Sequence, residues 1–490
     1  MQMVIIGNSA AGLNALESLR RLDSEARVTV VSAEPGPAYS RVLLPYFLRR
    51  RLPYERLFIR GYEDYRRLGA ECLVGTRVEQ VEPARGTALL DDGRRLPYDR
   101  LLVATGSRPV KPPIPGLESP GVFHLWTLKD ALSLDPLLQP HRRLLVLGSG
   151  FVALQAAWAA AARGLKVTVF ELLPRIMPKA LDRKSASILA EQIRAHGVDL
   201  RTGVQTEAVE RESSGSHGVS IRGSGRAEVF DVLVIATGVQ ANTELLLDSL
   251  PKARPGIPVD ARMQTGLVGV YAAGDVALGP TAYGELHESH ALWPTAVEHG
   301  KVAGREMAGH STDYRGSLNM NVTQMFGVTV ASMGRYDEDV TLRDDEDAGP
   351  VTTRLGGKLR VWERIEPESP RCVRIVTRDG IPIGATVIGD STDAALLGQL
   401  RPFVRLRRPL PQPERFLAGG GLPASLWRQV PWRQGPFRQV RLRTAQRPAA
   451  RFPAAQRPAS HWQDPRQLEA PAGAVRRREA SEQRHARGPG

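Results

Sequence analysis

Two glycine-rich stretches carry the clearest chemical signal in this 490-residue sequence. Residues 7–12 follow an apolar run at 4–6, and residues 148–153 follow a second apolar run at 143–147. Glycine allows the backbone to turn tightly and to approach a ligand, and the first amide groups of a following helix attract an anion. Both stretches are therefore predicted to hold a pyrophosphate.

An acidic residue stands at the matching place after each glycine stretch. Glu34 follows the apolar run at 28–31, and Glu171 closes the run at 166–170. A carboxylate there accepts hydrogen bonds from ribose hydroxyls when strand, turn, helix and parallel strand form one unit. The spacing predicts two such dinucleotide-binding units, at about 4–34 and 143–171.

The two glycine motifs are not equally complete. Ser9 replaces the middle glycine of the first motif, so that motif by itself also fits an ordinary strand, turn and helix. The second motif is a complete GxGxxA. The motif residues predicted to contact a cofactor are Gly7, Ser9, Ala10, Ala11, Gly12, Gly148, Gly150 and Ala153.

An internal repeat strengthens the dinucleotide interpretation. The sequence Ala-Thr-Gly ends an apolar run at 104–106 and again at 236–238, once after each glycine motif. Two domains that bind no nucleotide would not be expected to share this order. Thr105, Gly106 and Gly238 are therefore added to the candidate cofactor residues. Gly274 and Asp275 end a further strand, where the aspartate could bind the ribityl hydroxyls of a flavin.

Neither thiol nor metal chemistry is predicted. Cys72 and Cys372 are the only cysteines, which gives no disulfide framework and fits a reducing compartment, the cytoplasm. Each lies in a predicted strand, where a buried small side chain is the better interpretation. The His287, Glu288 and His290 group favours a polar loop over a metal site. Residues 298 and 299, Glu and His, are interpreted as a helix surface because neighbours on a helix do not face each other.

Composition excludes some classes of partner. The net charge of +14 sits in residues 401–490, which hold 19 arginines, no lysine and five acids, so the preceding 400 residues are neutral. Nucleic acid is therefore not an expected partner, except for nonspecific binding by the tail. No apolar run approaches the roughly 18 residues of a membrane helix, and the first strand begins too early for a leader.

The residues after 400 are rich in Arg, Pro, Gln and Ala, and Gln-Arg-Pro-Ala occurs at both 446–449 and 456–459. This composition predicts a disordered tail. Two other interpretations stay open: a functional tail that binds RNA or membrane, and a shifted reading frame in GC-rich DNA.

The order of these motifs resembles the FAD-dependent pyridine nucleotide-disulfide oxidoreductase family over residues 1 to about 400. Residues 39–44, 171–176 and 321–327 are most similar to the branch that holds rubredoxin reductases and the flavin portion of assimilatory nitrite reductases. The sequence departs from the disulfide-reducing members, since it lacks both the cysteines near the flavin and the catalytic His-Glu pair.

The resemblance implies an α/β fold with two Rossmann-like domains. An FAD-binding domain would comprise residues 1–115 and 245–320, with prolines at 109–115 marking the crossover to an NAD(H)-binding domain at 116–244. A small α+β domain would follow at 321–400, with the disordered tail at 401–490.

The resemblance also assigns roles to the candidate residues. Gly7, Ser9, Gly12 and Glu34 would hold the adenosine and pyrophosphate of FAD, Arg41 would lie near the flavin, and Asp275 would bind the ribityl chain. Gly148, Gly150 and Glu171 would hold NAD(H). No protein residue is assigned a catalytic role, because the flavin performs the redox chemistry.

The expected activity is NADH-dependent electron transfer through FAD to a carrier of the rubredoxin, ferredoxin or nitrite-reductase type. The alternatives are an NADH oxidase or a reductase of a small acceptor, and a flavin- or nucleotide-binding regulator without turnover. NADH is expected over NADPH because Glu171 would repel a 2′-phosphate, an effect that Arg175 could weaken. Arg41 and Arg49–Arg51 are the candidate surface for an acidic carrier, and a homodimer is compatible with the sequence.

Overall fold

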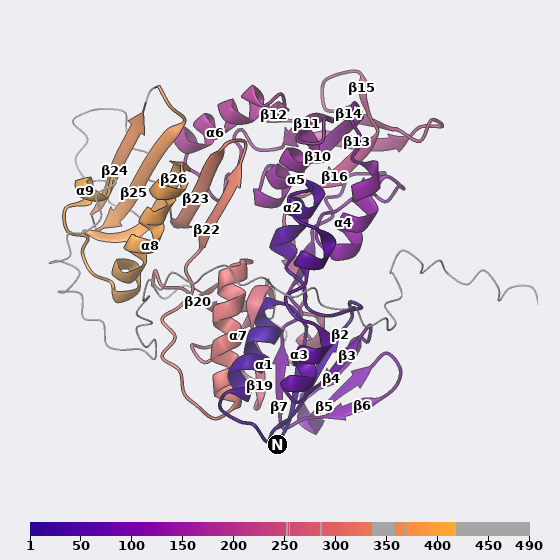
Figure 1. The fold of residues 1–490 in the computed structure, drawn as a ribbon, viewed down its shortest axis with the longest axis vertical. Coiled ribbons are helices and arrows are strands. Elements are labelled where there is room, and N and C mark those ends of the chain that lie inside the picture. The colour runs from indigo at the N-terminus through magenta and orange to yellow at the C-terminus, as the bar shows by residue number, and fades with distance from the viewer. Residues whose placement is uncertain (251–252, 254, 285–286, 336–357, 367, 418–490) are drawn as a thin grey trace, which may run out of the picture. The chain divides into compact units, whose positions relative to one another are not determined.

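The computed structural model describes residues 1–250, 253, 255–284, 287–335, 358–366 and 368–417 (Figure 1). They belong to one compact unit, Met1–Trp427. The second unit, Arg428–Gly490, belongs to the predicted tail and lies outside the described residues. Among the described residues, no helix is both long enough and apolar enough to span a bilayer.

The first predicted βαβ unit is present and forms the centre of a five-stranded parallel sheet. Strand β1 (Gln2–Ile6) pairs with β2 (Arg27–Ser32) on one side and with β7 (Arg100–Val103) on the other. Helix α1 (Ala10–Arg20) connects β1 to β2. The sheet order is β19 (Val270–Ala272), β7, β1, β2 and β3 (Ala70–Val74). Parallel strands bring their carboxyl ends to one edge, so the turns after β1, β7 and β19 meet there.

The second predicted unit forms a matching parallel sheet. Strand β10 (Arg143–Leu147) leads through Gly148–Gly150 into α5 (Phe151–Ala161), and the chain returns as β11 (Lys166–Glu171). The strand expected before Gly238 is β16 (Val232–Ile235), which pairs with β10. The sheet order is β12 (Asp199–Thr202), β11, β10, β16 and β9 (Val122–Phe123).

Smaller elements complete these two regions. One antiparallel sheet contains β4 (Val78–Glu82), β5 (Thr87–Leu90) and β6 (Arg95–Pro97), and another contains β13 (Thr206–Arg211), β14 (His217–Ile221) and β15 (Ala227–Phe230). A third contains β18 (Ile257–Pro258), β20 (Ala277–Pro280) and β21 (His287–Glu288). The remaining helices here are α2 (Leu44–Leu48), α3 (Tyr62–Arg67), α4 (Leu128–Leu134), α6 (Arg183–Ala195) and α7 (Trp293–Met307).

The chain crosses between the two regions where the proline cluster was predicted to mark a crossover. Strand β8 (Ser107–Pro109) pairs antiparallel with the returning strand β17 (Val239–Ala241). One hydrophobic contact nevertheless crosses the predicted domain limits. Residues Leu44 and Phe47 of α2, expected in the first domain, share a hydrophobic core with Leu144 and Leu154 of the second. Helix α2 therefore ties the two regions together outside the crossover.

The predicted small α+β domain is an antiparallel sheet followed by helices. Its strand order is β22 (Met320–Met325), β23 (Val328–Gly334), β26 (Ile381–Gly389), β25 (Arg371–Arg378) and β24 (Leu359–Glu366). Helix α8 (Ser391–Leu406) begins at Asp390, whose side chain accepts from the amides of Thr392 and Asp393. This is a standard N-cap, and Asp393 completes the capping box.

The predicted start of the tail at residue 401 is wrong. Helix α8 continues to Leu406, and α9 (Pro413–Leu417) follows it. Phe403 and Phe416 are buried and meet edge to face with ring centroids 6.1 Å apart. The Arg/Pro-rich composition concealed these apolar residues, whose burial supplies the free energy that orders the segment. The remainder of the predicted tail, residues 418–490, lies outside the described residues.

The interpretation of residues 298 and 299 as a helix surface is also wrong. His299 is only 1% exposed and packs edge to face against Tyr314. Glu298 pairs with Arg401 at 2.6 Å and with Arg405 at 2.7 Å, both on α8. The two side chains do point in different directions, as helix geometry requires, but another part of the protein packs against each of them.

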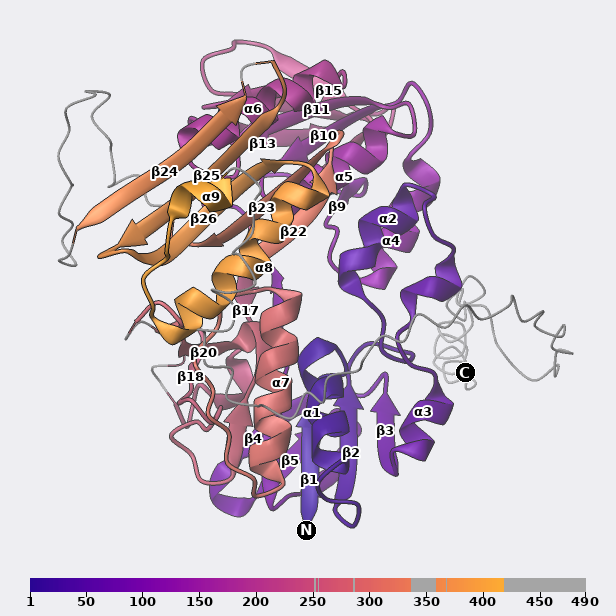
Figure 2. The ribbon, with the colours of Figure 1, turned by 60° about the vertical axis from the view of Figure 1, so that its left-hand side comes forward.

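Glycines on α7 allow its backbone to lie directly against that of α1 (Figure 2). A Cβ added at Gly300 would lie 2.2 Å from the carbonyl oxygen of Ala11, and one at Gly304 would lie 2.2 Å from that of Ala15. No real Cβ approaches an oxygen this closely, so both positions require glycine. This contact fixes the N-terminus of α1, which carries the first glycine motif.

Gly300→Val is expected to force α7 away from α1. We expect the free energy of unfolding to fall by more than about 2 kcal/mol, because backbone atoms cannot make room for the added carbons. Urea unfolding and the amount of cofactor retained on purification measure the effect. Gly398→Ala is the matched control, since Gly398 is exposed on α8 with open space around its Cβ position. That control should change stability by no more than about 1 kcal/mol. A Gly300→Val protein as stable as the control would contradict the packing argument.

Stability should decline between about pH 6.5 and pH 4 because of His299. Burial, together with the neighbouring His290, lowers the pKa of His299 from 6.5 to about 4. The folded state therefore binds fewer protons than the unfolded state in this window, so its stability is complete above the window and is lost as the pH falls through it. The loss should reach roughly 3 kcal/mol.

His299→Leu should remove most of this dependence. We expect the difference in unfolding free energy between pH 7 and pH 5 to shrink in the variant. The same substitution at His310, which is exposed, is the control and should leave the difference unchanged. An equal pH dependence in wild type and His299→Leu would refute the assignment.

Candidate functional site

The first glycine turn is shaped by its contact with the strand beside it. Gly7 has a φ of +117°, and its N–H donates to the carbonyl oxygen of Val31 at 2.8 Å. A Cβ at Gly7 would lie 2.1 Å from the carbonyl oxygen of Ala104, and one at Gly12 would lie 1.9 Å from that of Gly7. The turn after β1 therefore packs against the turn after β7, and glycine is required at both motif ends.

The N-terminus of α1 lacks a side-chain cap. Ser9 is the N-cap residue, but its hydroxyl accepts no hydrogen bond from the helix. Ala10 and Ala11 form the buried start of the helix. The first amides of α1 therefore lack the usual side-chain acceptor at the end of a tight glycine turn, which fits a phosphate-binding role.

Glu34 and Arg41, predicted for opposite parts of the cofactor site, contact each other. The two side chains form an ion pair, and the Tyr39 hydroxyl donates to Glu34 Oε2 at 2.6 Å. The Arg41 guanidinium lies 5.6 Å from the centroids of both the Tyr39 and the Trp126 rings. Burial raises the pKa of Tyr39, so this phenol stays protonated and donates. Arg41 is thus held by charge and by two aromatic faces.

Trp126 is a site residue that sequence reasoning missed. Its carbonyl oxygen accepts from Arg41 at 2.8 Å, and its indole N–H donates to the carbonyl oxygen of Ser107 at 2.8 Å. The Ser107 hydroxyl then donates to Asp275 Oδ2 at 2.6 Å. Trp126 therefore links the Glu34 end of the site to the Asp275 end. It belongs to no motif and lies in the region expected to bind NAD(H), so no sequence signal marked it.

Asp275 is half-buried in the turn that follows β19. Burial raises the pKa of its carboxyl group, while the Ser107 hydrogen bond and the charge of Arg41 oppose that rise. Gly274, with a φ of +79°, brings this turn against α1, since a Cβ there would lie 3.1 Å from the Cβ of Ala11. The predicted residues of the first site are thus gathered at one edge of the sheet.

Thr105 and Gly106 lie at the crossover between the two regions. The Thr105 hydroxyl donates to the carbonyl oxygen of Asn242 at 2.8 Å, and the Asn242 amide N–H donates to that of Gly106 at 3.0 Å. The Asn242 side chain donates back to the carbonyl oxygen of Thr105. The observed role of both residues is to join the two strands that connect the regions.

The second glycine turn repeats the geometry of the first. Gly148 has a φ of +104°, and a Cβ there would lie 2.5 Å from the carbonyl oxygen of Ala236. Gly150 is the N-cap of α5 and has open space at its Cβ position, as does Gly238, while Ala153 is fully buried. In both units the turn glycine thus contacts the alanine of an Ala-Thr-Gly sequence. The sequence repeat is therefore a structural repeat.

Glu171 lies beside this turn and is held by two donors. The Ser149 hydroxyl donates to Oε2, and the Leu173 N–H donates to Oε1 at 2.8 Å. Leu172 and Leu173, which follow it directly, are solvent-exposed by 63% and 46%, and Val152 in the first turn of α5 is exposed by 36%. An acid beside exposed apolar side chains fits the ribose and adenine of a dinucleotide. Arg175, expected to weaken the preference for NADH, donates to the carbonyl oxygen of Leu181 at 2.9 Å.

Neither cysteine is placed for thiol chemistry. Cys72 lies in β3 and Cys372 in β25, where its side chain contacts Ser185 of α6. Burial raises the pKa of both thiols to about 11, so both are protonated at neutral pH and weakly reactive. Across the residues that the structure describes, no group of three or more His, Cys, Asp or Glu side chains could hold a metal ion.

The predicted polar loop at 287–290 contains a hydrogen-bond network around His290, which is buried while Glu288 is partly exposed. His290 contacts Glu288 at 3.0 Å through one ring nitrogen and Ser317 at 2.8 Å through the other. Arg335 pairs with Glu288, and the His290 and Arg335 contacts lower the pKa of that carboxyl group against its burial. The network joins β21 to the end of β23.

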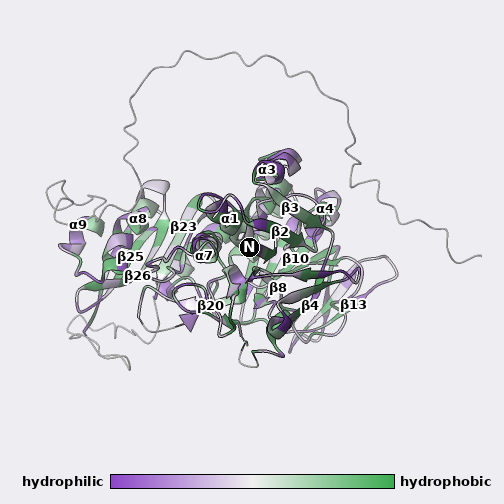
Figure 3. Ribbon diagram, turned by 90° about the horizontal axis from the view of Figure 1, so that it is seen from below, coloured by the Kyte–Doolittle hydropathy of each residue, from purple (hydrophilic) through white to green (hydrophobic). Residues whose placement is uncertain are grey.

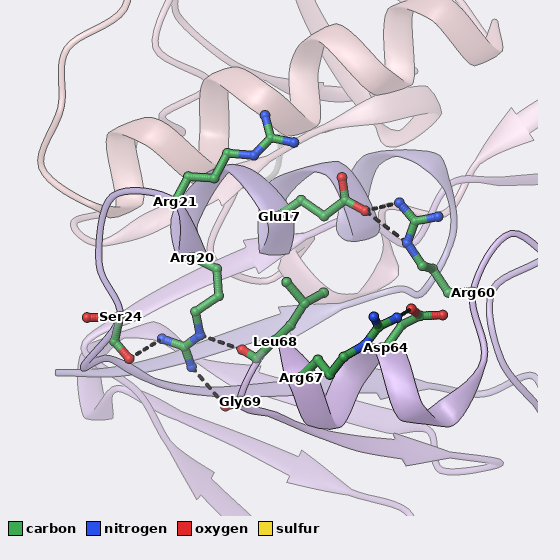
Figure 4. A pocket seen from close by; sticks show the side chains of 9 residues that line it. All are labelled: Glu17, Arg20, Arg21, Ser24, Arg60, Asp64, Arg67, Leu68 and Gly69. Atoms are coloured by element: carbon green, nitrogen blue, oxygen red, sulfur yellow. Dashed lines mark hydrogen bonds and ion pairs between the residues drawn. The ribbon is translucent and has the colours of Figure 1, made fainter. Parts of the chain in front are cut away.

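A polar surface groove lies at the opposite end of α1 from the glycine turn (Figure 4). Helix α3, which appears largely purple in Figure 3, contributes to its wall. Arg20 donates to the carbonyl oxygens of Leu68 and Gly69, and Arg60 pairs with Glu17. These cations hold α1 to the segment before β3, so the groove is explained by structural contacts and is separate from the glycine motifs.

Comparison with known proteins agrees with this geometry. The family model described as pyridine nucleotide-disulphide oxidoreductase matches residues 1–300. The chain belongs to this family. It is an FAD-dependent NAD(P)H oxidoreductase that binds FAD and NAD(H), and the two glycine turns are the candidate binding sites.

Similar proteins span most of the chain. The epsilon subunit of NADH-dependent phenylglyoxylate dehydrogenase from Aromatoleum evansii is 29% identical over 429 residues, which cover 87% of this chain and 96% of that subunit. Rhodocoxin reductase of Rhodococcus erythropolis is 32% identical and covers 64% of this chain and 74% of its own. Among solved structures, the putidaredoxin reductase–putidaredoxin complex matches with a TM-score of 0.74 and 21% identity, covering 88% of this chain and 97% of the other. That last similarity establishes the fold.

Replacing both cysteines by alanine should leave electron entry intact. Neither thiol is ionised or part of the cofactor network, so reduction of the flavin by NADH should stay within about twofold of the wild-type rate. Anaerobic stopped-flow absorbance measures this rate. The loss of the buried Cys372 sulfur should cost about 1 kcal/mol of stability, and the loss of the half-buried Cys72 sulfur should cost less. A folded, FAD-containing double variant that NADH no longer reduces would show that a thiol takes part.

Proposed function

We propose that this chain transfers electrons from NADH through FAD to a protein electron carrier of the rubredoxin, ferredoxin or nitrite-reductase type. The observation that carries the proposal is the position of the two thiols: Cys72 is half-buried and Cys372 is buried, and both are protonated and outside the cofactor network. Without a thiol relay, electrons must leave at the edge of the flavin. The similarity to rhodocoxin reductase and to a subunit of a larger NADH-dependent dehydrogenase supports a protein acceptor. The cysteine usage favours a cytoplasmic location.

The first site would hold FAD along the network from Glu34 to Asp275. The amides at the start of α1 would bind the pyrophosphate, and Glu34 would accept from the adenosine ribose. Because Arg41 contacts Glu34 and also acts on Asp275, we assign it to the middle of the cofactor, where its charge would balance the phosphates. Asp275 would accept from the ribityl hydroxyls.

The second site would hold NADH at the start of α5, with Glu171 on the adenosine ribose. FAD supplies the hydride acceptor when bound. The protein's contribution is alignment, since hydride transfer requires the two rings in contact at roughly 3 to 3.5 Å. The β8–β17 pair and the packing of α2 on α5 would hold the two sites in register.

The contacts of Arg49 and Arg50 favour Arg51 among the arginines predicted to dock an acidic carrier. The Arg49 guanidinium lies 3.1 Å from the centroid of the Trp158 ring, and Arg50 pairs with Asp135 at 2.9 Å. Both guanidinium groups thus already interact with other residues of the protein, which reduces the charge that they offer to a partner. Arg51 is exposed and remains the candidate for steering an acidic partner.

Arg51→Glu is expected to slow reduction of an acidic iron-sulfur carrier by roughly threefold to tenfold at low salt, because steering depends on local charge. The rate of flavin reduction by NADH should not change. Arg262→Glu, at another exposed site of the same charge, is the control. Carrier reduction that is unaffected by Arg51→Glu and by salt would place docking elsewhere.

The acceptor class is tested with the purified protein. NADH is added without oxygen until the flavin is bleached, and reoxidation is then followed after adding a ferredoxin, a rubredoxin or oxygen. Rapid reoxidation by an iron-sulfur carrier supports the proposal. Reoxidation by oxygen alone would favour an NADH oxidase, and a flavin that NADH fails to bleach would favour a regulatory protein.

A further inference from the structure

Ser149 occupies the middle of the second glycine motif, between Gly148 and Gly150, and is 1% exposed. Its hydroxyl accepts from the Met177 N–H at 3.2 Å and contacts Glu171 Oε2. A backbone N–H can only donate, and the serine hydroxyl has a single hydrogen. That hydrogen must therefore point to Glu171, so the direction of this hydrogen bond is determined.

Glu171 is correspondingly fixed in orientation. Oε2 accepts from Ser149, and Oε1 accepts from the Leu173 N–H at 2.8 Å. The residue is only 8% exposed, and a carboxylate in such a place needs hydrogen-bond donors to replace the water it loses. Each carboxylate oxygen accepts about two hydrogen bonds, so each retains capacity for one more donor. Two such acceptors suit the two hydroxyls of a ribose.

We propose that Ser149 is a positioning residue for cofactor specificity: through its hydrogen bond it holds the Glu171 carboxylate in the orientation that accepts a ribose diol and disfavours a 2′-phosphate. This inference rests on the proposed function in one respect, the assignment of Glu171 to the NADH ribose. Its new element is that one residue of the pyrophosphate turn also sets the selectivity of the ribose site.

The position of Ser149 links the glycine turn, which would bind the pyrophosphate, to Glu171, which would bind the ribose. Its backbone is held by Gly148, which contacts the carbonyl oxygen of Ala236, and by Gly150, which begins α5. The turn that would bind the pyrophosphate therefore also fixes the donor to Glu171. An alanine at this position would preserve the turn and remove the hydroxyl, which is both the donor to Glu171 and the acceptor of the Met177 N–H.

Ser149→Ala is expected to weaken binding of NAD⁺ about tenfold and to strengthen binding of NADP⁺ relative to it, because a hydrogen bond to a charged group is lost. Isothermal titration of the oxidised, FAD-containing protein with NAD⁺ and NADP⁺ measures both constants directly. In steady-state kinetics KM for NADH should rise by the same factor while kcat changes less than twofold. Ser149→Thr, which keeps a hydroxyl, should restore much of the preference.

Ser185→Ala is the matched control. The Ser185 hydroxyl is also buried and donates to a carboxylate, Asp182 Oδ2, at 2.7 Å, but it lies between α6 and the C-terminal sheet. Its loss should lower the melting temperature without changing the ratio of NAD⁺ to NADP⁺ affinity. A Ser149→Ala variant that likewise changes only the melting temperature would overturn the inference.

Glu171→Gln and the double variant separate the two proposals. If Glu171→Gln leaves the NAD⁺ to NADP⁺ ratio unchanged, the assignment of Glu171 to the ribose fails. If Glu171→Gln changes the ratio and Ser149→Ala does not, only the role of Ser149 fails. If Ser149 acts through Glu171, the ratio of the double variant should equal that of Glu171→Gln alone. Fully additive effects would show that Ser149 acts independently and would overturn the inference.

Discussion

The close contact of each turn glycine with a neighbouring strand end is the constraint on which the rest of the structure depends. Gly7 lies against the carbonyl of Ala104, and Gly148 lies against that of Ala236. Each contact places the start of a helix at the edge where the parallel strands end. The first amides of the helix and the acid after the second strand then fall on the same edge, so one local contact positions a whole candidate dinucleotide site.

Longer-range contacts complete the first site. Arg41 is held by Glu34, Tyr39 and Trp126, and Trp126 reaches Asp275 through Ser107. Trp126 comes from the segment expected to belong to the NAD(H) domain, and α2 from the first domain packs into the core of the second. Residues from both predicted domains therefore meet at the candidate cofactor site, and the packing of α2 joins the two regions.

The errors of sequence interpretation share one cause, which is that composition and local periodicity do not show what covers a residue. Residues 401–417 read as the start of a tail because arginine and proline dominate them, yet Phe403 and Phe416 are buried together. Glu298 and His299 read as an exposed helix face, yet α8 supplies Arg401 and Arg405 to one and Tyr314 packs on the other. In both places the partner lies far away in the sequence.

The sequence by itself determined the two βαβ units, their glycine turns, the terminal acids and the absence of a cysteine pair. These features follow from backbone geometry, since a tight turn requires glycine and a buried parallel strand requires an apolar run. Only the tertiary structure decided that Glu34 contacts Arg41, that Trp126 joins the site, that Ser149 holds Glu171 and that α7 needs Gly300 and Gly304. Those contacts depend on which surfaces meet after folding, and no local pattern of residue types encodes that.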